Sequence, residues 1–497
     1  MGKAGGILEN IKSNQNQKAQ KGLFFLIFIP CLLISQALDN DVWFLLNSGR
    51  YVLHNGFPVT EPFTVHEGLS FVMQQWLTSS LFWTVYAKLG VFGLFALVMI
   101  FYCLIVFILY KISMLVSENN FIVSYGITML TGALITPFMV TRPYIISTLL
   151  IVLEIFCLES YIIRGKKEYL YILPVLSALE INFHAAMWPM LFVILIPYWI
   201  DAFKFRFLFI KGQGYPKISF LIVSILMFAA GFANPYGFDA MTYLFKSYGY
   251  PEISYMVQEM LPADINVGFG KWIFGTLLAV TLTYILYKKG NTKLRYVLLT
   301  LGTAFLALSS MRGFLFFSIC GLFPLSYFLR EAKIKEKTPS SPKRQVLIRI
   351  LLIAAVCAAL VFGLADKYQK SVRFASKPDG ADAVGYLLEH ADPDTAVVYT
   401  SYDVGGYAEY MGFRCYIDPR AEVFVKNNNG KKDIMREYYD LQRGRIYYQD
   451  FLSRYDFTHL LVPKGDVLYT CLPHDAGYKL IYEDADYRLF ERLANQS

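Results

Sequence analysis

The strongest constraint on this chain is a series of apolar runs, each close to the length of a membrane-spanning helix. A helix needs about 20 mostly apolar residues to cross the hydrocarbon core of a bilayer. The eleven segments that meet or approach this length are 22–38, 91–112, 121–140, 143–163, 168–183, 185–200, 217–234, 272–287, 295–310, 312–328 and 345–366. With 56% hydrophobic residues, only 17% charged residues and a mean hydropathy of +0.41, the chain is predicted to be a polytopic α-helical membrane protein.

The basic residues indicate how this protein is oriented. Clusters of Lys and Arg lie at 164–167, 204–217, 288–295 and 330–345, which are alternate connections between the apolar segments. Because cytoplasmic loops are enriched in Lys and Arg, the formal net charge of +8 is a topology signal rather than a sign of a nucleic-acid partner. The sequence therefore predicts a cytoplasmic tail over 1–21, a first segment retained as a signal anchor, and an extracytoplasmic C-terminus.

The domain organisation follows from this orientation. The stretch from Trp76 to Gly90 is apolar but shorter than a span, and a crossing there would place the later basic clusters outside. We therefore expect a helix lying in the outer interface, within a large external loop over 39–90. A transmembrane domain is predicted over 22–366, and an extracytoplasmic domain over 367–497.

The C-terminal segment differs in kind from the rest. Helix-like stretches such as ADAVGYLLEHA and IMREYYDLQRG alternate with short strand-like runs such as AVVYT, RCYID, HLLVP and YKLIYE. This alternation predicts a small α/β domain. Its glycines do not follow a phosphate-binding GxGxxG spacing, which argues against a nucleotide site. Of the seven cysteines, only Cys415 and Cys471 lie in this soluble-looking region, and the sequence leaves open whether they are bonded.

Under this predicted topology, the polar residues that stand out within and between the apolar segments all fall on the external side. They are Asp39, Asp41, Arg142, Asn182, His184, Asn234, Glu252, Glu259 and Arg312. Each class also has a structural explanation: acids suit the first turn of a helix, arginines anchor helix ends at the interface, and the Asn-Pro-Tyr-Gly stretch at 234–237 is a common turn. Their shared side is the informative feature, because one external cleft could collect them.

Two further carboxylates lie within predicted spans. Glu154 is near the middle of its segment and Glu180 is near an outer end. A charge at the bilayer centre costs about 2.5–3.5 kcal/mol on insertion scales, so such groups usually face a bundle interior or a water-filled cavity. This placement is compatible with an enzyme and with a transporter.

A series of motifs runs along most of the chain in a recognisable order. DVWFLLNSG extends from Asp41 to Gly49, PVTEPFT from Pro58 to Thr64, and QWL begins at Gln75. Then come Arg142-Pro143, Asn182-Phe-His184, Asn234–Gly237, Glu259 with Pro262, Arg312, and SYDVGGYAEYMGF followed by YIDPRAE. This order resembles the GT-C class of bacterial integral membrane glycosyltransferases, which use polyprenyl-phosphate sugars as donors.

Two positions depart from the pattern of that class. Gln75 stands where the family has an acidic residue before the Trp, and Glu61 stands where it has an Asp before Pro-Phe. If the reaction requires a carboxylate before Trp76, then either another acid replaces it or the chain is inactive.

The resemblance implies transfer of a hexosyl or pentosyl unit from a polyprenyl phosphate to an extracytoplasmic hydroxyl of a glycan, lipid or protein, with inversion. Asp41 is the expected general base, with Asp39 as second candidate. The residues expected to hold the lipid phosphate are Arg142, His184, Arg312 and Asn182. Further site candidates are Glu61, Gln75, Glu252, Glu259 and Asn234.

The sequence leaves open whether the protein uses a metal ion and which class of function it has. A divalent cation, Mg²⁺ or Mn²⁺, held by Asp41 and Glu259 is compatible with the ligand chemistry, although no ligand spacing specifies it. The alternative functions are a lipid or solute transporter or flippase, and a non-catalytic assembly protein of a cell-envelope polysaccharide system. No convincing internal repeat supports the transporter.

Overall fold

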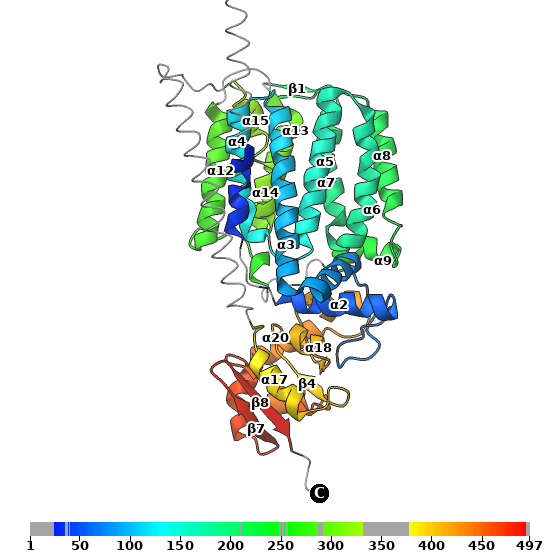
Figure 1. Cartoon of the computed structure of the whole chain (residues 1–497), viewed down its shortest axis with the longest axis vertical. Helices are drawn as coiled ribbons and strands as arrows, with labels where there is room; N and C mark the ends of the chain where they lie inside the picture. Colours follow the sequence, from blue (N-terminus) through cyan, green and yellow to red (C-terminus); the bar gives the residue numbers. More distant parts are fainter. Residues whose placement is uncertain are drawn as a thin grey trace, which may run out of the picture.

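The computed structural model describes residues 24–34, 38, 40–208, 210–247, 250, 253, 257–286, 292–331 and 377–493. Apolar helices form a bundle, and the C-terminal domain lies beyond one end of it (Figure 1). The predicted span 345–366 and the site candidates Asp39 and Glu252 lie outside the described residues.

The bundle contains the predicted apolar segments as helices. They are η1 (Phe24–Leu33), α3 (Trp76–Val116), α4 (Phe121–Ile135) with η2 (Thr136–Phe138), α5 (Tyr144–Arg164), η3 (Lys167–Ile172) with α6 (Leu173–Phe183), η4 (Ala185–Met187) with α7 (Trp188–Asp201), α8 (Lys217–Ala230), α12 (Gly268–Leu286), α13 (Leu294–Ser309), α14 (Gly313–Cys320) and α15 (Leu325–Phe328). Among the described residues, four stretches are long and apolar enough to cross a membrane by themselves: Trp76–Val116, Phe121–Phe138, Tyr144–Arg164 and Gly268–Leu286. The other described segments are shorter apolar helices.

Two predicted spans depart from a continuous α-helix at a proline. The first described segment, η1, is a 3-10 helix with Pro30 inside it, and proline lacks the backbone N–H that an α-helix needs. The segment 312–328 is divided into α14 and α15, and Pro324 stands at the start of α15. Proline positions therefore explain both departures from regular α-helix.

The end of the bundle far from the C-terminal domain is closed by a small sheet and a buried ion-pair network. Strands β1 (Arg206–Phe207), β2 (Ile210–Lys211) and β3 (Thr292–Lys293) pair in that order. Beside them Arg295, which is fully buried, binds Glu159 and Asp201, each at 2.8 Å. These contacts join α13, α5 and α7.

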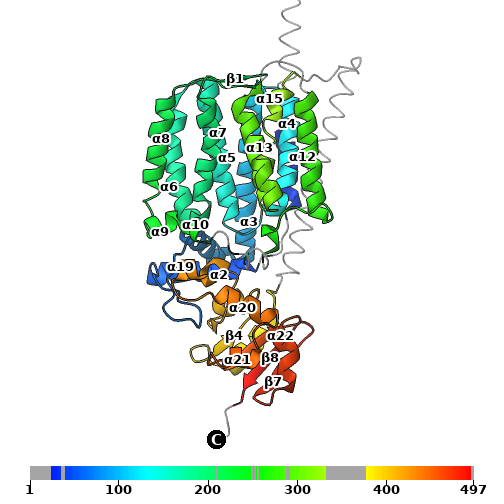
Figure 2. The ribbon, with the colours of Figure 1, turned by 180° about the vertical axis from the view of Figure 1, so that it is seen from behind.

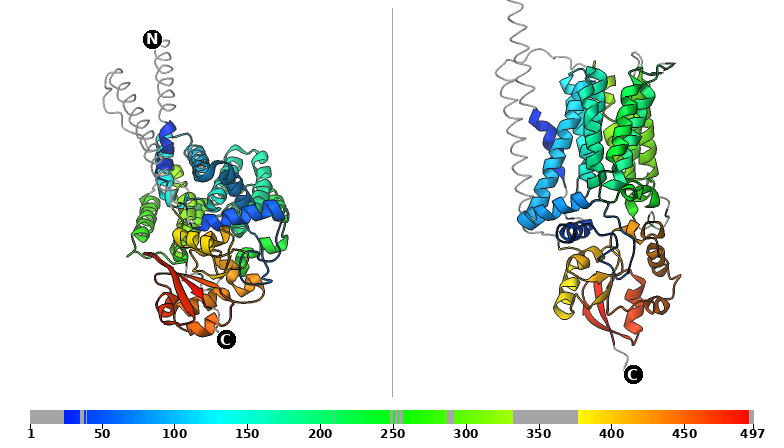
Figure 3. Two further views of the ribbon diagram at one scale, coloured as in Figure 1. Left: turned by 60° about the horizontal axis from the view of Figure 1, so that its bottom comes forward. Right: turned by 90° about the vertical axis from the view of Figure 1, so that its right-hand side faces the viewer.

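Two helices of the external loop lie across the opposite end of the bundle. Helix α2 (Asp41–Asn55) runs between the bundle and the C-terminal domain (Figure 1). Helix α3 is bent at Gly90, whose φ of 60° is left-handed, and its first part turns away from the bundle axis (Figure 3). The end of the stretch expected to form the interface helix, Gly90, therefore coincides with this bend.

The C-terminal domain has a mixed sheet with helices around it. The strands are β4 (Val397–Tyr399), β5 (Arg414–Cys415), β6 (His459–Pro463), β7 (Tyr478–Glu483) and β8 (Tyr487–Arg492), in the order β5-β4-β6-β8-β7. The helices are α17 (Ala381–His390), α18 (Gly405–Tyr410), η6 (Ala421–Phe424), α19 (Lys426–Asn429), α20 (Ile434–Gln442), α21 (Tyr448–Leu452), α22 (Val467–Cys471) and η7 (Leu472–His474). Strand β4 pairs in parallel with β5 and β6, whereas β8 is antiparallel to β6 and β7. Cys415 and Cys471 are both free thiols.

The external loop is joined to this domain by backbone pairing and by a shared core. Thr64 forms a parallel bridge with Cys415, and the N–H of Ser70 donates to the carbonyl of Asn429 at 2.9 Å. Leu69, Phe71 and Met73 of the loop belong to the same buried cluster as Tyr416 and Phe424 of the domain. Helix α10 (Tyr243–Ser247) also contacts α19 near α2 (Figure 2), where Asn428 donates to Ser247 at 2.6 Å.

Candidate functional site

A cavity of about 440 Å³ lies where the bundle, the external loop and the C-terminal domain meet. The bundle and the external loop contribute Asn40, Asp41, Phe44, Gln74, Gln75, Arg142, Pro143, Tyr144, His184, Ala186, Met187, Tyr243, Leu244, Ser247, Ile253, Val257, Glu259, Met260 and Arg312, and the C-terminal domain adds Tyr402, Asp403, Pro419, Ala421 and Glu422. Most of the polar residues that the sequence placed on one side therefore line a single cavity.

Two arginines and two carboxylates form the charged centre of this cavity. Arg142 lies between Asp41, at 3.2 Å, and Glu259, at 3.3 Å. Arg312 binds the same Glu259 at 2.8 Å. The four side chains retain between 17% and 50% exposure, so a ligand entering the cavity can reach them.

The start of α2 explains why Asp41 is available here. Asn40 occupies the N-cap position but makes no capping hydrogen bond, and its amide donates instead to Asp379 at 2.8 Å. Asp41 lies in the first turn, where a negative charge is favoured by the helix dipole. Its carboxylate also reaches Arg142. Asp41 can therefore stabilise the start of the helix and still be available in the cavity.

A tight backbone arrangement places Arg312 against Glu259. The N–H of Arg312 donates to the carbonyl of Glu259 at 3.1 Å, and the N–H of Met311 donates to the carbonyl of Leu261 at 3.0 Å. Gly313 permits this turn, because a Cβ atom there would lie 2.0 Å from the carbonyl oxygen of Leu306. Arg312 also donates to the Tyr144 hydroxyl at 3.3 Å and lies over its ring.

His184 is held at the break between α6 and η4. Its ring packs edge-on against Tyr144, with 5.0 Å between ring centroids, and its Nδ1 lies 3.0 Å from the Ser147 hydroxyl. Burial, with a smaller contribution from the charge of Arg312, lowers the pKa of His184 to about 3. The imidazole is therefore neutral at physiological pH, and any interaction with an anion depends on which ring nitrogen carries the proton.

Asn182 and Asn234 lie outside the cavity. The Asn182 oxygen accepts from the Trp76 indole at 2.9 Å, and its amide donates to the carbonyls of Ala178 and Ala233, each at 2.7 Å. Asn234 donates to the carbonyls of Gly231 and Gly237 within its own turn. Because these amides already bind the surrounding protein, the structure does not bring Asn182 to the place expected of a phosphate ligand.

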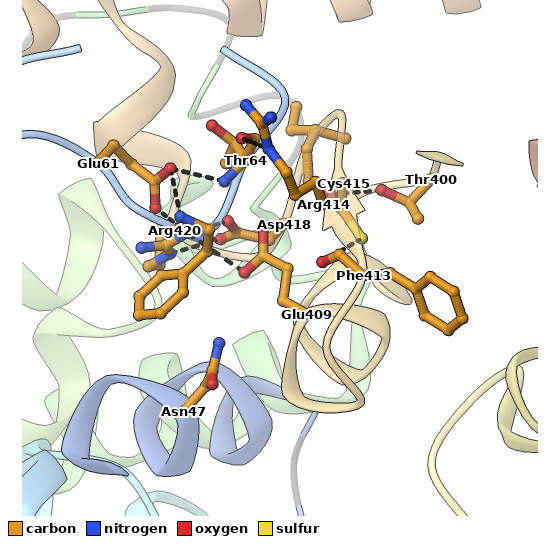
Figure 4. A network of polar contacts seen from close by, with 12 residues as sticks. Asn47, Glu61, Thr64, Thr400, Glu409, Phe413, Arg414, Cys415, Asp418 and Arg420 are labelled. Atoms are coloured by element: carbon orange, nitrogen blue, oxygen red, sulfur yellow. Dashed lines mark hydrogen bonds and ion pairs between the residues drawn. The ribbon is translucent and has the colours of Figure 1, made fainter. Parts of the chain in front are cut away.

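Glu61 is also separate from the cavity. It is buried against Arg420 at 2.9 Å and accepts hydrogen bonds from the N–H groups of Phe63 and Thr64 (Figure 4). Its observed contacts thus join the external loop to the C-terminal domain. Gln75, in contrast, lines the cavity.

Sequence reasoning did not select the residues that the C-terminal domain contributes. Tyr402, Asp403 and Glu422 line the cavity, and Glu422 accepts from the Gln74 amide at 2.7 Å. Burial raises the pKa of Glu422 above its ordinary value. The motifs SYDVGG and DPRAE contain these residues, so these motifs could have identified them as site candidates. Tyr144, which directly follows Arg142-Pro143, was also missed.

The charged centre does not match a divalent-metal site well. Arg142 occupies the position between the Asp41 and Glu259 carboxylates that a bridging cation would take. Within the described ranges, no group of three or more His, Cys, Asp and Glu side chains is arranged to hold a metal ion.

The apolar helical bundle, with its C-terminal mixed-sheet domain and polar cavity, is that of an integral membrane protein. The sequence matches no protein-family model and no curated protein. The fold is similar to the crystal structure of ArnT from Cupriavidus metallidurans in the apo state, with a TM-score of 0.53 and 10% identity over 96% of this chain and 98% of that chain. The predicted likeness to the GT-C class is thus confirmed for the fold.

Proposed function

We propose that this protein is a glycosyltransferase that moves a sugar from a polyprenyl-phosphate donor to an extracytoplasmic hydroxyl. The observation that carries the proposal is the cavity in which Asp41 lies beside two arginines, within a fold shared with ArnT. A fold of this class supports a polyprenyl-phosphate-sugar donor, whereas the identity of sugar and acceptor is not specified by a likeness at 10% identity.

The donor is suited to a cavity at this end of the bundle. A polyprenyl chain must remain in lipid while its phosphate reaches polar groups, and α2 lies across the end of the apolar helices at the cavity. Arg142 and Arg312 supply charge-assisted hydrogen bonds for the phosphate, and a neutral His184 supplies a further donor if the proton is on its cavity-facing nitrogen.

The proposed reaction is a direct displacement with inversion. The Asp41 carboxylate accepts the proton of the acceptor hydroxyl as its oxygen attacks the anomeric carbon. The bond between that carbon and the phosphate oxygen breaks, and its electron pair leaves with the polyprenyl phosphate. Arg142 and Arg312 stabilise the charge that develops on the leaving oxygen.

The replacement of the expected acid by Gln75 is compatible with this chemistry. Glu259 and Glu422 line the same cavity, and Glu422 is bound to Gln74, the neighbour of Gln75. A carboxylate from another part of the chain is thus present near that position. Glu61 is the other position that departs from the family pattern. It pairs with Arg420 outside the cavity, which supports a structural role for this residue.

The test is turnover of a panel of polyprenyl-phosphate sugars by the purified protein in lipid. We expect release of polyprenyl phosphate with inverted product, and a loss of at least about a hundredfold in kcat for Asp41→Asn, because the general base is removed. Asp382→Asn is the control, since Asp382 is an exposed acid that pairs with Lys377 and does not line the cavity. Equal release by wild type and Asp41→Asn would remove Asp41 from its role.

The same assay separates the alternatives. A glycosyltransferase with an external site should keep most turnover in Glu154→Gln, because Glu154 does not line the cavity. A transporter that uses this intramembrane acid should lose transport in that variant. Wild-type protein that binds polyprenyl phosphate but turns over no donor would favour the non-catalytic assembly protein.

A further inference from the structure

A short chain of polar groups leads from the cavity into the helical bundle. His184 lines the cavity, and its Nδ1 lies 3.0 Å from the hydroxyl oxygen of Ser147 in α5. The same hydroxyl oxygen lies 2.5 Å from Oε1 of Glu180 in α6. All three residues are buried, with 6% exposure for His184, 1% for Ser147 and none for Glu180. The polypeptide has therefore placed a hydroxyl and a carboxyl group behind the ring of a cavity residue.

The direction of the hydrogen bonds in this chain decides what His184 presents to the cavity. Ser147 has one hydroxyl proton, so it donates either to Glu180 or to His184. If it donates to Glu180, the histidine Nδ1 must carry a proton and Nε2 is left with a lone pair. If it donates to Nδ1, the neutral ring carries its proton on Nε2 and becomes a donor toward the cavity.

The surroundings of Glu180 favour the second arrangement. Among the described residues, neither Lys nor Arg forms an ion pair with this fully buried carboxyl group, and the nearby Glu154 would add negative charge. Burying an unpaired carboxylate is costly, so the group is neutral and carries a proton. Within the same part of the chain Oε2 has no hydrogen-bond partner, and a buried proton needs an acceptor. The proton therefore belongs on Oε1, in the short contact with Ser147.

We propose that Glu180 and Ser147 are positioning residues that fix His184 as the Nε2–H tautomer, so that a neutral imidazole donates a hydrogen bond to a lipid-phosphate oxygen. The Glu180 hydroxyl donates to Ser147, and the Ser147 hydroxyl donates to Nδ1. Nδ1 is thereby satisfied as an acceptor, and the remaining ring proton faces the cavity. The identity of the ligand rests on the proposed function, whereas the tautomer rests only on the contacts of these three residues.

The direct test is the nitrogen NMR spectrum of histidine-labelled protein in lipid, with the His184 signals assigned by loss in His184→Gln. We expect Nδ1 to show the shift of an unprotonated nitrogen and Nε2 that of a protonated one. A signal from the Nδ1–H tautomer, or from a charged imidazolium, would overturn the proposal. This readout needs no turnover, so it stands even if the glycosyltransferase proposal fails.

Variants then test whether the chain acts on phosphate binding. Ser147→Ala is expected to raise the Kd for polyprenyl phosphate about three- to tenfold, the usual contribution of one hydrogen bond. Glu180→Leu should have a similar effect, and Glu180→Gln should rescue it, because the amide can still donate to Ser147. Loss of binding in Glu180→Gln equal to that in Glu180→Leu would show that an ionised carboxylate is required and would overturn the proposal.

A matched control excludes a general effect of removing a buried hydroxyl. Ser318 in α14 is fully buried, and its hydroxyl has no hydrogen-bond partner among the described residues. Ser318→Ala should leave the Kd for polyprenyl phosphate and the His184 spectrum unchanged. If Ser147→Ala behaves like Ser318→Ala in both measurements, the positioning role is contradicted.

Discussion

Arg420 is surrounded by more negative charge than it can neutralise. Its guanidinium contacts the carboxylates of Glu61 at 2.9 Å, Glu409 at 3.3 Å and Asp418 at 2.5 Å (Figure 4). All four side chains are at most 4% exposed, so water screens the excess charge poorly. Burial, followed by the charge of Asp418, raises the pKa of Glu409 well above its ordinary value.

This shift predicts a dependence of stability on pH. In the folded protein Glu409 keeps its proton at pH values where the unfolded chain, with a pKa of about 4.3, has lost it. The stabilisation is complete below that value and falls by about 1.4 kcal/mol for each pH unit up to the raised pKa, because the folded state binds more protons. Glu409→Gln should remove this fall, so its thermal unfolding midpoint should decline less than that of wild type between about pH 4 and 8. Parallel curves for the two proteins would contradict the assignment of the proton to Glu409.

The individual residues of the site differ in how well the sequence predicted them. Asp41, Arg142, Glu259 and Arg312 were expected in one external cleft, and they line one cavity. Asn182 was expected there too, because it is predicted on the same side and because Asn182-Phe-His184 belongs to the series of motifs that resembles the GT-C class. Its hydrogen bonds to Trp76 and to nearby carbonyls depend on how the helices pack, and a sequence pattern does not contain that information.

At the scale of elements, the crossing of α2 and α3 depends on Gly49. A Cβ atom at this position would lie 2.0 Å from the carbonyl oxygen of Ser79, so the two helices can approach only where no side chain intervenes. Their contact is completed by Trp43 packing on Tyr86, with 6.2 Å between ring centroids. Gly49, the last residue of the DVWFLLNSG motif, therefore sets the position of the helix that carries Asp41.

Gly49→Ala should accordingly lower both stability and turnover. Overpacking of this kind typically costs about 1–3 kcal/mol, and the displacement of α2 would move Asp41 relative to Arg142. Gly275→Ala in α12 is the matched control, because a Cβ atom there would meet nothing within 4 Å. Thermal unfolding and kcat should both fall for Gly49→Ala and stay near wild type for the control. Equal behaviour of the two variants would show that the close approach is not required.

Helices and strands were predicted correctly where the sequence pattern was strong. The prediction failed where contacts with distant segments determine the local structure. The apolar runs gave the helices of the bundle, and four strands of the C-terminal domain coincide with the runs expected for them. Strand β8 (Tyr487–Arg492) was missed, because charged residues at both ends obscure its apolar centre. It becomes a strand by pairing on both sides, with β6 and β7. Strand β5 ends earlier than expected, at Cys415, and Asp418 then accepts hydrogen bonds from Arg420 within a turn.

At the scale of the whole molecule, the cavity is a product of assembly between distant parts of the chain. The C-terminal domain contributes Tyr402 and Glu422, and it is held in place by the external loop through Arg420, the bridge at Cys415 and a shared apolar core. This explains why the sequence could place both regions outside the membrane without showing that they form one site. Contacts between residues more than 300 positions apart follow from docking, which local patterns do not report.

The functional proposal also requires the cavity end of the molecule to face away from the cytoplasm, and this orientation is testable. Lys479 in β7 and Lys204, two residues before β1, are both exposed. Strands β7 and β1 lie toward opposite ends of the molecule (Figures 1 and 2). In a Cys471→Ser background, Lys479→Cys should react with a membrane-impermeant thiol reagent in intact cells. Lys204→Cys should react only after permeabilisation, because the basic loop at 204–217 is predicted to be cytoplasmic. The reverse pattern would place Asp41 and both arginines in the cytoplasm, and an acceptor outside the cell could then not be the substrate.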